Sequence, residues 1–98
     1  MKAKPVAPRR QMLYTDGRIA DLDGPITIEA ARKLIRANNI GTVLLKDGVH
    51  VMLIDDDGIR RGLAYNYAAS LLYRAKCGGN PEARIYGDAI VVPDSDFA

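Results

Sequence analysis

The residues that could do covalent chemistry are few, and they stand apart in the sequence. The chain has one histidine, His50, inside an apolar run, and one cysteine, Cys77, which precedes two glycines and has only Lys76 beside it. A nucleophilic thiol needs an activating base, and His50 would have to reach it across the fold. A single cysteine also excludes a disulfide within the chain and a cysteine-based zinc site. We expect no catalytic residues, no metal site and no cofactor.

The acidic run Asp55–Asp57 is the one candidate for a cation-binding loop. A calcium loop of the EF-hand type needs acidic residues at positions 1, 3 and 5 and a glycine at position 6. Asp55 and Asp57 fit the first two positions, but Ile59 and Arg60 occupy the fifth and sixth. Because the motif fails, the aspartates and the following Gly58 are more typical of a polar turn.

Arginine and tyrosine gather directly after this turn, at Arg60, Arg61, Tyr65 and Tyr67. Both residue types are over-represented among the residues that dominate binding energy at protein interfaces. We expect these four side chains to form a partner-binding surface. The alternative is that the two tyrosines merely pack around the start of a helix.

Positive charge is concentrated in the first ten residues. This leader carries Lys2, Lys4, Arg9 and Arg10 without an acid, whereas the other 88 residues hold ten bases and twelve acids. Its two prolines favour an extended, mobile arm. Such an arm could bind nucleic acid in a salt-sensitive way, or simply be a solvated terminus. The leader lacks the apolar stretch of a secretory signal, so we expect a cytoplasmic protein.

The hydrophobic pattern predicts two helices and five to six short strands. Thr27 and Asn66 are suitable N-caps for helices over 28–38 and 67–76. Two Asp-Gly pairs, at 16–17 and 47–48, are typical of tight hairpin turns. Gly87 indicates a bulge or a close approach of another backbone. The expected strands are 12–15, 18–20, 42–46, 49–54, the less regular 60–65, and 84–92.

This order of elements predicts one α+β domain over residues 11–93, between the flexible leader 1–10 and an acidic tail 94–98. We expect a two-layer sandwich, with both helices on one face of a mixed or antiparallel sheet. The strand 49–54 is apolar on both faces, and 89–92 is apolar as well. Two helices on one face would leave such strands partly uncovered, so a homodimer is favoured. No apolar run reaches the roughly 20 residues of a membrane span.

Several short motifs in the second half resemble a known family. They are Asp56-Asp57-Gly58, Gly62-Leu63-Ala64-Tyr65-Asn66, Ala69-Ser70-Leu71 and Ile85–Val92. Over roughly residues 43–92 the chain is similar to a small domain of unknown function found in phages, plasmids and actinobacteria. It departs from that pattern at Ala64, where the family has proline, and at Ser70, where threonine is usual. The resemblance transfers no catalytic residue, but it implies an accessory protein of a phage or mobile element.

These observations favour a binding function over catalysis. A domain of this size has room for a protein footprint of roughly 800 Å² but little room for a deep pocket. We expect stoichiometric, non-enzymatic binding to a host protein, as in an anti-defence or anti-CRISPR-like inhibitor. One alternative is a nucleic-acid-binding protein that uses the basic arm. Another is a protein that sequesters a small anionic nucleotide between arginine and tyrosine side chains.

Overall fold

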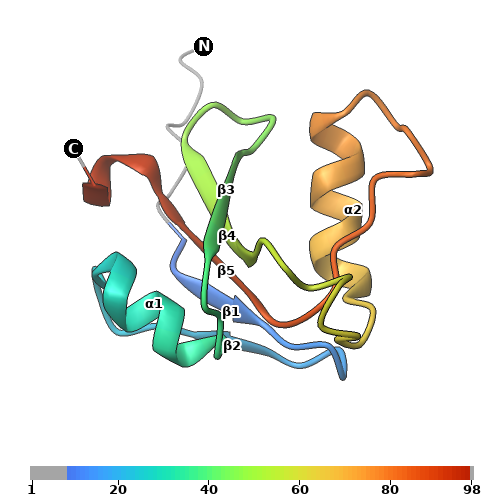
Figure 1. The fold of residues 1–98 in the computed structure, drawn as a ribbon. Coiled ribbons are helices and arrows are strands. Elements are labelled where there is room, and N and C mark those ends of the chain that lie inside the picture. Colours follow the sequence, from blue (N-terminus) through green and yellow to red (C-terminus); the bar gives the residue numbers. More distant parts are fainter. Residues whose placement is uncertain (1–8, 98) are drawn as a thin grey trace, which may run out of the picture.

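The computed structural model describes residues 9–97 and places them in one antiparallel sheet with two α-helices (Figure 1). The strand order within these residues is β2-β1-β5-β4-β3, and every neighbouring pair is antiparallel. The elements are β1 (Gln11–Leu13), β2 (Ile19–Asp21), α1 (Ile28–Leu34), β3 (Ile40–Leu44), β4 (His50–Asp55), α2 (Tyr67–Lys76), β5 (Ala89–Pro93) and a 3₁₀ turn, η1 (Asp94–Phe97). The predicted α+β class is confirmed. The described residues contain no helix long and apolar enough to cross a membrane.

The two helices lie on opposite faces of the sheet (Figure 1). Val51 and Leu53 of β4 pack in the cluster that contains Ala31 of α1, whereas Met52 packs in the cluster that contains Ala69 of α2. Successive side chains of a strand point to opposite faces, so the helices must cover different sides. The prediction that both helices lie on one face is therefore wrong, and the domain has three layers.

The three layers also account for the strands that are apolar on both sides. Every residue of β5, the central strand, is buried, and so is nearly all of β4. Their two faces are covered by α1 and α2 within a single chain. The pattern that favoured a homodimer thus has an explanation that needs no second copy.

Helix α1 ends four residues earlier than the sequence predicts. Ile35 caps it, and Arg36 then adopts a left-handed conformation with φ 55°. The backbone N–H of Arg36 donates to Lys33, and that of Ala37 donates to Arg32, which closes the helix. Glycine or asparagine is usual at such a position, so the helix end could not be located from residue type.

The last predicted strand is interrupted. Gly87 has φ 95°, and β5 begins only at Ala89. Before the interruption Tyr86 makes an isolated antiparallel bridge with Tyr65, and the N–H of Gly87 donates to the carbonyl of Ala64. A Cβ at Gly87 would lie 2.8 Å from a methyl carbon of Leu63, so the expected close approach does occur, though with a side chain. Segment 60–65 forms no sixth strand.

Candidate binding sites

An ion pair between a buried aspartate and a partly exposed arginine fixes the loop that follows β4. Asp55 ends that strand with its carboxylate almost fully buried, bonded to the guanidinium of Arg61. The same carboxylate accepts the backbone N–H of Asp57 at 2.8 Å. Arg61 also donates to the carbonyl of Arg36 at 2.9 Å. The pair therefore joins β4, the loop and the end of α1.

Gly58 allows this loop to lie against the segment before β5. A Cβ at Gly58 would be 2.4 Å from the carbonyl oxygen of Tyr86, closer than any side chain permits. The N–H of Leu63 donates to Gly58 and closes the loop. Glycine is thus required here by the close approach of another backbone.

Asn66 holds the start of α2 against the sheet. Its side chain is fully buried, and its Oδ1 accepts the N–H of Ala69, as an N-cap should. Its amide nitrogen donates to the carbonyls of Leu13 and Gly87, at 3.0 and 2.9 Å. All the polar atoms of this amide are thus in use, which fixes the neighbouring residues Tyr65 and Tyr67 relative to the core.

The four predicted partner-binding residues have different environments. Arg60 is 77% exposed in its side chain and lies 3.2 Å from Asp57, and Tyr67 is 64% exposed. Tyr65 packs edge to face on Tyr86, with ring centroids 5.7 Å apart. Arg61 is bonded to Asp55 and to a backbone carbonyl, so its role is structural.

An open hollow brings Tyr65 together with three residues that the sequence did not indicate. Arg74, Arg84 and Tyr86 line it with Tyr65, and its volume is about 310 Å³. Arg74 donates to the hydroxyl of Tyr65 at 2.8 Å and to the carbonyl of Ala83 at 3.2 Å. One signal in the sequence could have indicated Arg74, because helical spacing puts it on the same side of α2 as Tyr67. Arg84 and Tyr86 reach the hollow only through the bridge between Tyr65 and Tyr86.

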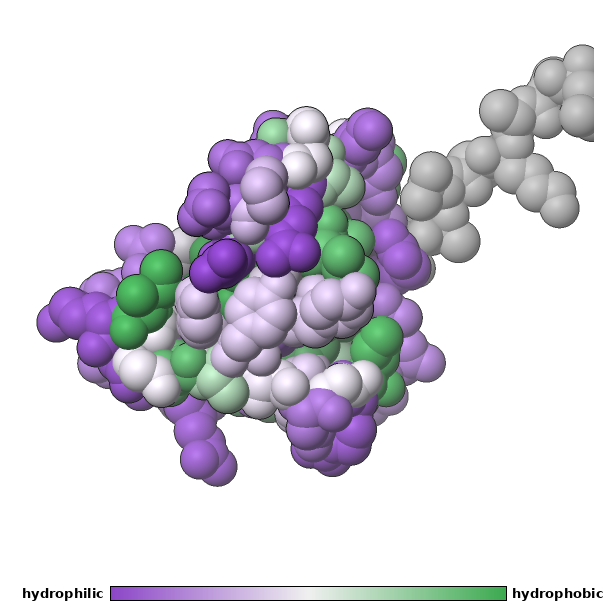
Figure 2. Space-filling model, turned by 90° about the vertical axis from the view of Figure 1, so that its right-hand side faces the viewer, coloured by the Kyte–Doolittle hydropathy of each residue, from purple (hydrophilic) through white to green (hydrophobic). Residues whose placement is uncertain are grey.

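Arg74 connects the hollow to the exposed side of α2. Tyr67, Leu71 and Arg74 follow one another at helical spacing, and Leu71 is 46% exposed. Figure 2 looks onto this side of the molecule and shows pale, weakly polar residues gathered at its centre, between hydrophobic and hydrophilic ones. We call this region the α2 surface. It comprises Tyr65, Tyr67, Leu71, Arg74, Arg84 and Tyr86.

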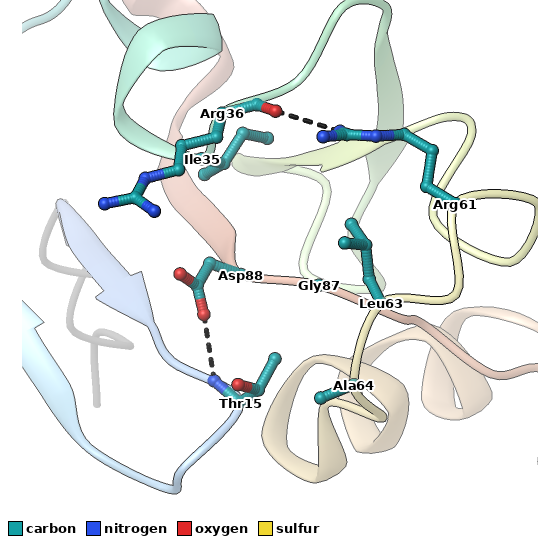
Figure 3. A pocket seen from close by; sticks show the side chains of 8 residues that line it. All are labelled: Thr15, Ile35, Arg36, Arg61, Leu63, Ala64, Gly87 and Asp88. Carbon is teal, nitrogen blue, oxygen red and sulfur yellow. Dashed lines mark hydrogen bonds between the residues drawn. The ribbon is translucent and has the colours of Figure 1, made fainter.

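A second hollow, of about 300 Å³, lies beside the Gly87 segment (Figure 3). Asp88 lines it, with one carboxylate oxygen accepting the backbone N–H of Thr15 at 3.0 Å. We call it the Asp88 hollow. Its lining residues are Thr15, Ile35, Arg36, Arg61, Leu63, Ala64, Gly87 and Asp88.

The single histidine is part of the core. His50 is fully buried, its Nε2 accepts the backbone N–H of Arg9 at 2.9 Å, and its Nδ1 lies 2.6 Å from Asp47. The Nε2 contact places the ring proton on Nδ1, which donates to Asp47. Burial opposes ionisation of Asp47, but the N–H groups of His50 and Val49 and the ring outweigh it and lower the pKa of Asp47 to about 2. Both ring nitrogens are thus bonded within the fold, and Cys77 is exposed elsewhere.

The proposed nucleic-acid arm is described only at its end. Arg10 makes two hydrogen bonds to the carboxylate of Asp96, at 2.9 and 2.8 Å, and the bond from Arg10 lowers the pKa of Asp96. Arg9 is attached to His50 through its backbone N–H. Lys2 and Lys4 lie outside the described residues. One of the two described arginines is therefore neutralised by its own chain.

The aspartates of the 55–57 run face different partners, since Asp55 bonds to Arg61 and Asp57 to Asn39 and Arg60. Across residues 9–97, no three His, Cys, Asp or Glu side chains are grouped closely enough to hold a metal ion. No family model, curated protein or solved structure matches the chain. The resemblance drawn over residues 43–92 therefore stays a prediction.

Proposed function

We propose that the protein acts by stoichiometric, non-enzymatic binding of a partner protein through the α2 surface. The observation that carries this proposal is the pair of arginines in the hollow beside Tyr65 and Tyr86. Neither Arg74 nor Arg84 makes an ion pair within residues 9–97. Five of the nine arginines do pair with carboxylates in the same part of the chain, so folding has left charge available at this surface.

The chemistry of the α2 surface favours an acidic partner segment with a neighbouring apolar residue. A guanidinium binds a carboxylate through charge-assisted hydrogen bonds, each worth roughly 1.5–3 kcal/mol where water is excluded. Tyr65 and Tyr86 supply rigid rings beside the two arginines, onto which an apolar group of the partner can pack. Tyr67 and Leu71 extend this contact along the helix with exposed apolar area.

The environments of two buried ionisable groups, His50 and Asp55, support binding over catalysis. A general base must present a free nitrogen or oxygen to the substrate, and His50 uses both ring nitrogens inside the fold. The carboxylate of Asp55 is likewise bonded to Arg61 and to a backbone N–H. That the partner is a host defence protein is a proposal that rests on the resemblance to a phage and plasmid family.

A selection from a random peptide display library tests the proposal. The full chain is the bait, and the selected peptides are then titrated against wild type, Arg84→Ala and Lys33→Ala. Lys33 is an exposed lysine on α1, so its variant removes the same charge from the other side of the sheet. We expect peptides rich in Asp and Glu that bind Arg84→Ala at least tenfold more weakly than they bind wild type or Lys33→Ala. Peptides without an acidic excess, or equal affinity for all three proteins, would contradict it.

A second function is favoured by the same hollow, namely sequestration of a small anionic nucleotide. Two tyrosines and two arginines in about 310 Å³ offer rings for a base and guanidiniums for a phosphate. Titration calorimetry with nucleoside monophosphates, using wild type and Arg84→Ala, tests it. Saturable binding that Arg84→Ala abolishes, and that displaces the selected peptides, would support the nucleotide as the natural ligand.

A further inference from the structure

The Asp88 hollow is built separately from the α2 surface. It lies between the turn after β1, which supplies Thr15, the end of α1, which supplies Ile35 and Arg36, and the segment that contains Leu63. None of its lining residues belongs to the α2 surface. Its volume of about 300 Å³ is at the lower end of the range for small-molecule sites.

Two opposite charges line this hollow without pairing. Figure 3 shows the guanidinium of Arg36 and the carboxylate of Asp88 beside the same space, with no bond between them. No ion pair joins them in the part of the chain that the structure describes. One carboxylate oxygen of Asp88 accepts the N–H of Thr15, and the other makes no hydrogen bond within residues 9–97, so it can bind a ligand.

The other cations near Asp88 have partners of their own. Arg18 bonds to Asp16 at 2.7 Å and lies over the ring of Tyr14, 4.4 Å from its centroid. The Asp16 bond raises the pKa of Arg18 most, and Asp88 adds only a small Coulombic contribution. Arg61 is bonded to Asp55 and to the carbonyl of Arg36. Arg36 is therefore the lining arginine whose charge has no partner within residues 9–97.

The backbone around the hollow is held in an unfavourable conformation. Arg36 is the one residue other than glycine in the described chain with a positive φ, and such a conformation costs roughly 1–2 kcal/mol. Arg61 bonds to the Arg36 carbonyl and so stabilises it. Gly87, which also lines the hollow, packs so closely on Leu63 that a Cβ at this position would collide with the Leu63 side chain. Strain of this kind tends to collect where a ligand is bound.

We propose that the Asp88 hollow binds a small zwitterion of the size of a free α-amino acid. The ligand's carboxylate lies on Arg36 and its ammonium group on Asp88, while an aliphatic side chain contacts Ile35 and Leu63. A ligand with negative charge alone would be repelled by Asp88, and one with positive charge alone by Arg36. Only a molecule with both charges satisfies both groups.

Nuclear magnetic resonance titrations of the ¹⁵N-labelled full chain test this inference. The probes are the twenty free amino acids, each up to 20 mM, with N-acetyl-L-leucine and L-leucinamide as partners of L-leucine that keep only one charge. We expect saturable shifts at the amides of Thr15 and Asp88, strongest for aliphatic amino acids. L-leucine should bind at least tenfold more tightly than either derivative. Absence of saturation for all twenty, or equal binding of N-acetyl-L-leucine, would overturn the proposal.

Two variants separate binding from folding. Asp88→Asn keeps an oxygen for the Thr15 N–H, and Arg36→Gly suits the positive φ at that position. Both should unfold at or near the wild-type temperature, and both should weaken L-leucine binding at least tenfold. Arg60→Ala, which removes an exposed arginine outside the hollow, should leave the affinity unchanged. Wild-type affinity in Arg36→Gly would refute the assignment.

Discussion

Arg61 and Arg84 belong to two segments that the bridge between Tyr65 and Tyr86 brings together, yet the two guanidiniums have different surroundings. Arg61 bonds to the buried carboxylate of Asp55 and to the carbonyl of Arg36, and so ties a loop to the core. Arg84 is exposed and lines an open hollow with two tyrosines and with Arg74, and neither arginine makes an ion pair within residues 9–97. Residue type and position in the sequence do not distinguish the two. The difference is whether folding supplies a carboxylate, which is why we place the proposed binding surface around α2 and leave Arg61 out of it.

The largest effect should follow from the loss of Arg61. Arg61→Ala leaves the carboxylate of Asp55 buried without its cation, which typically destabilises a protein by roughly 3–5 kcal/mol. For a domain of this size that corresponds to a fall of about 15 °C or more in Tm, measured by circular dichroism. Arg60→Ala is the control, because its pair with Asp57 is largely exposed and contributes about 0–1 kcal/mol. If the two variants had the same Tm, the Arg61 side chain would be as available to bind a partner as that of Arg60.

Gly58 links the two regions, because its loop carries Arg61 and its backbone touches Tyr86. Gly58→Ala places a methyl group against the Tyr86 carbonyl and should destabilise by about 2–3 kcal/mol, as overpacking does. Gly62→Ala is the matched control. It meets no atom within 4 Å but has φ 68°, so about 1 kcal/mol is expected. Urea unfolding measures both, and a smaller loss for Gly58→Ala would show that the loop can move away from Tyr86.

Asp47 is a second carboxylate that is hydrogen-bonded within the fold, as Asp55 is. Substituting it tests whether its charge also stabilises the folded chain. Its folded pKa of about 2 lies below the ordinary 3.8, so its stabilisation is present above pH 4 and is lost as the pH falls towards 2. Asp47→Asn should unfold about 1 kcal/mol more easily at pH 7, allowing for solvent screening, and this gap should shrink strongly by pH 2, where Asp47 is about half protonated in the folded chain. Asp21→Asn, an exposed substitution on the edge strand β2, is the control and should change the free energy of unfolding at pH 7 by no more than about 0.5 kcal/mol. A gap for Asp47→Asn that is as large at pH 2 as at pH 7 would contradict the electrostatic origin.

Local features of the fold could be predicted from the sequence, and features set by distant contacts could not. Thr27 and Asn66 cap their helices as predicted, and α2 spans 67–76, because capping depends on residues three positions apart. The end of α1 could not be predicted, because Arg36 is held left-handed partly by a bond from Arg61. The side of the sheet on which each helix packs could not be predicted either, because both faces of β4 are largely apolar.

The same distinction explains which residues of the proposed α2 surface the sequence could indicate. Tyr65 and Tyr67 were predicted because aromatic and basic residues cluster locally after the turn. Arg84 and Tyr86 lie about twenty residues further on, and only the bridge between Tyr65 and Tyr86 brings them to the same hollow. The pairing of Arg61 with Asp55 depends on the path of the loop, which residue types do not reveal.

The smallest effect on stability should come from Arg84, and this makes it the sharpest test of the comparison. Arg84 is exposed and makes no ion pair within residues 9–97, so Arg84→Ala should change the free energy of unfolding by no more than about 0.5 kcal/mol. The same variant should lose at least tenfold in affinity for an acidic peptide. Arg61→Ala should show the reverse, because at a temperature where it is still folded it retains Arg74 and Arg84. Arg61→Ala would then lose stability but keep its binding, and Arg84→Ala would lose binding but keep its stability. This pair of results would separate the charges that stabilise the fold from those that are available to bind a partner.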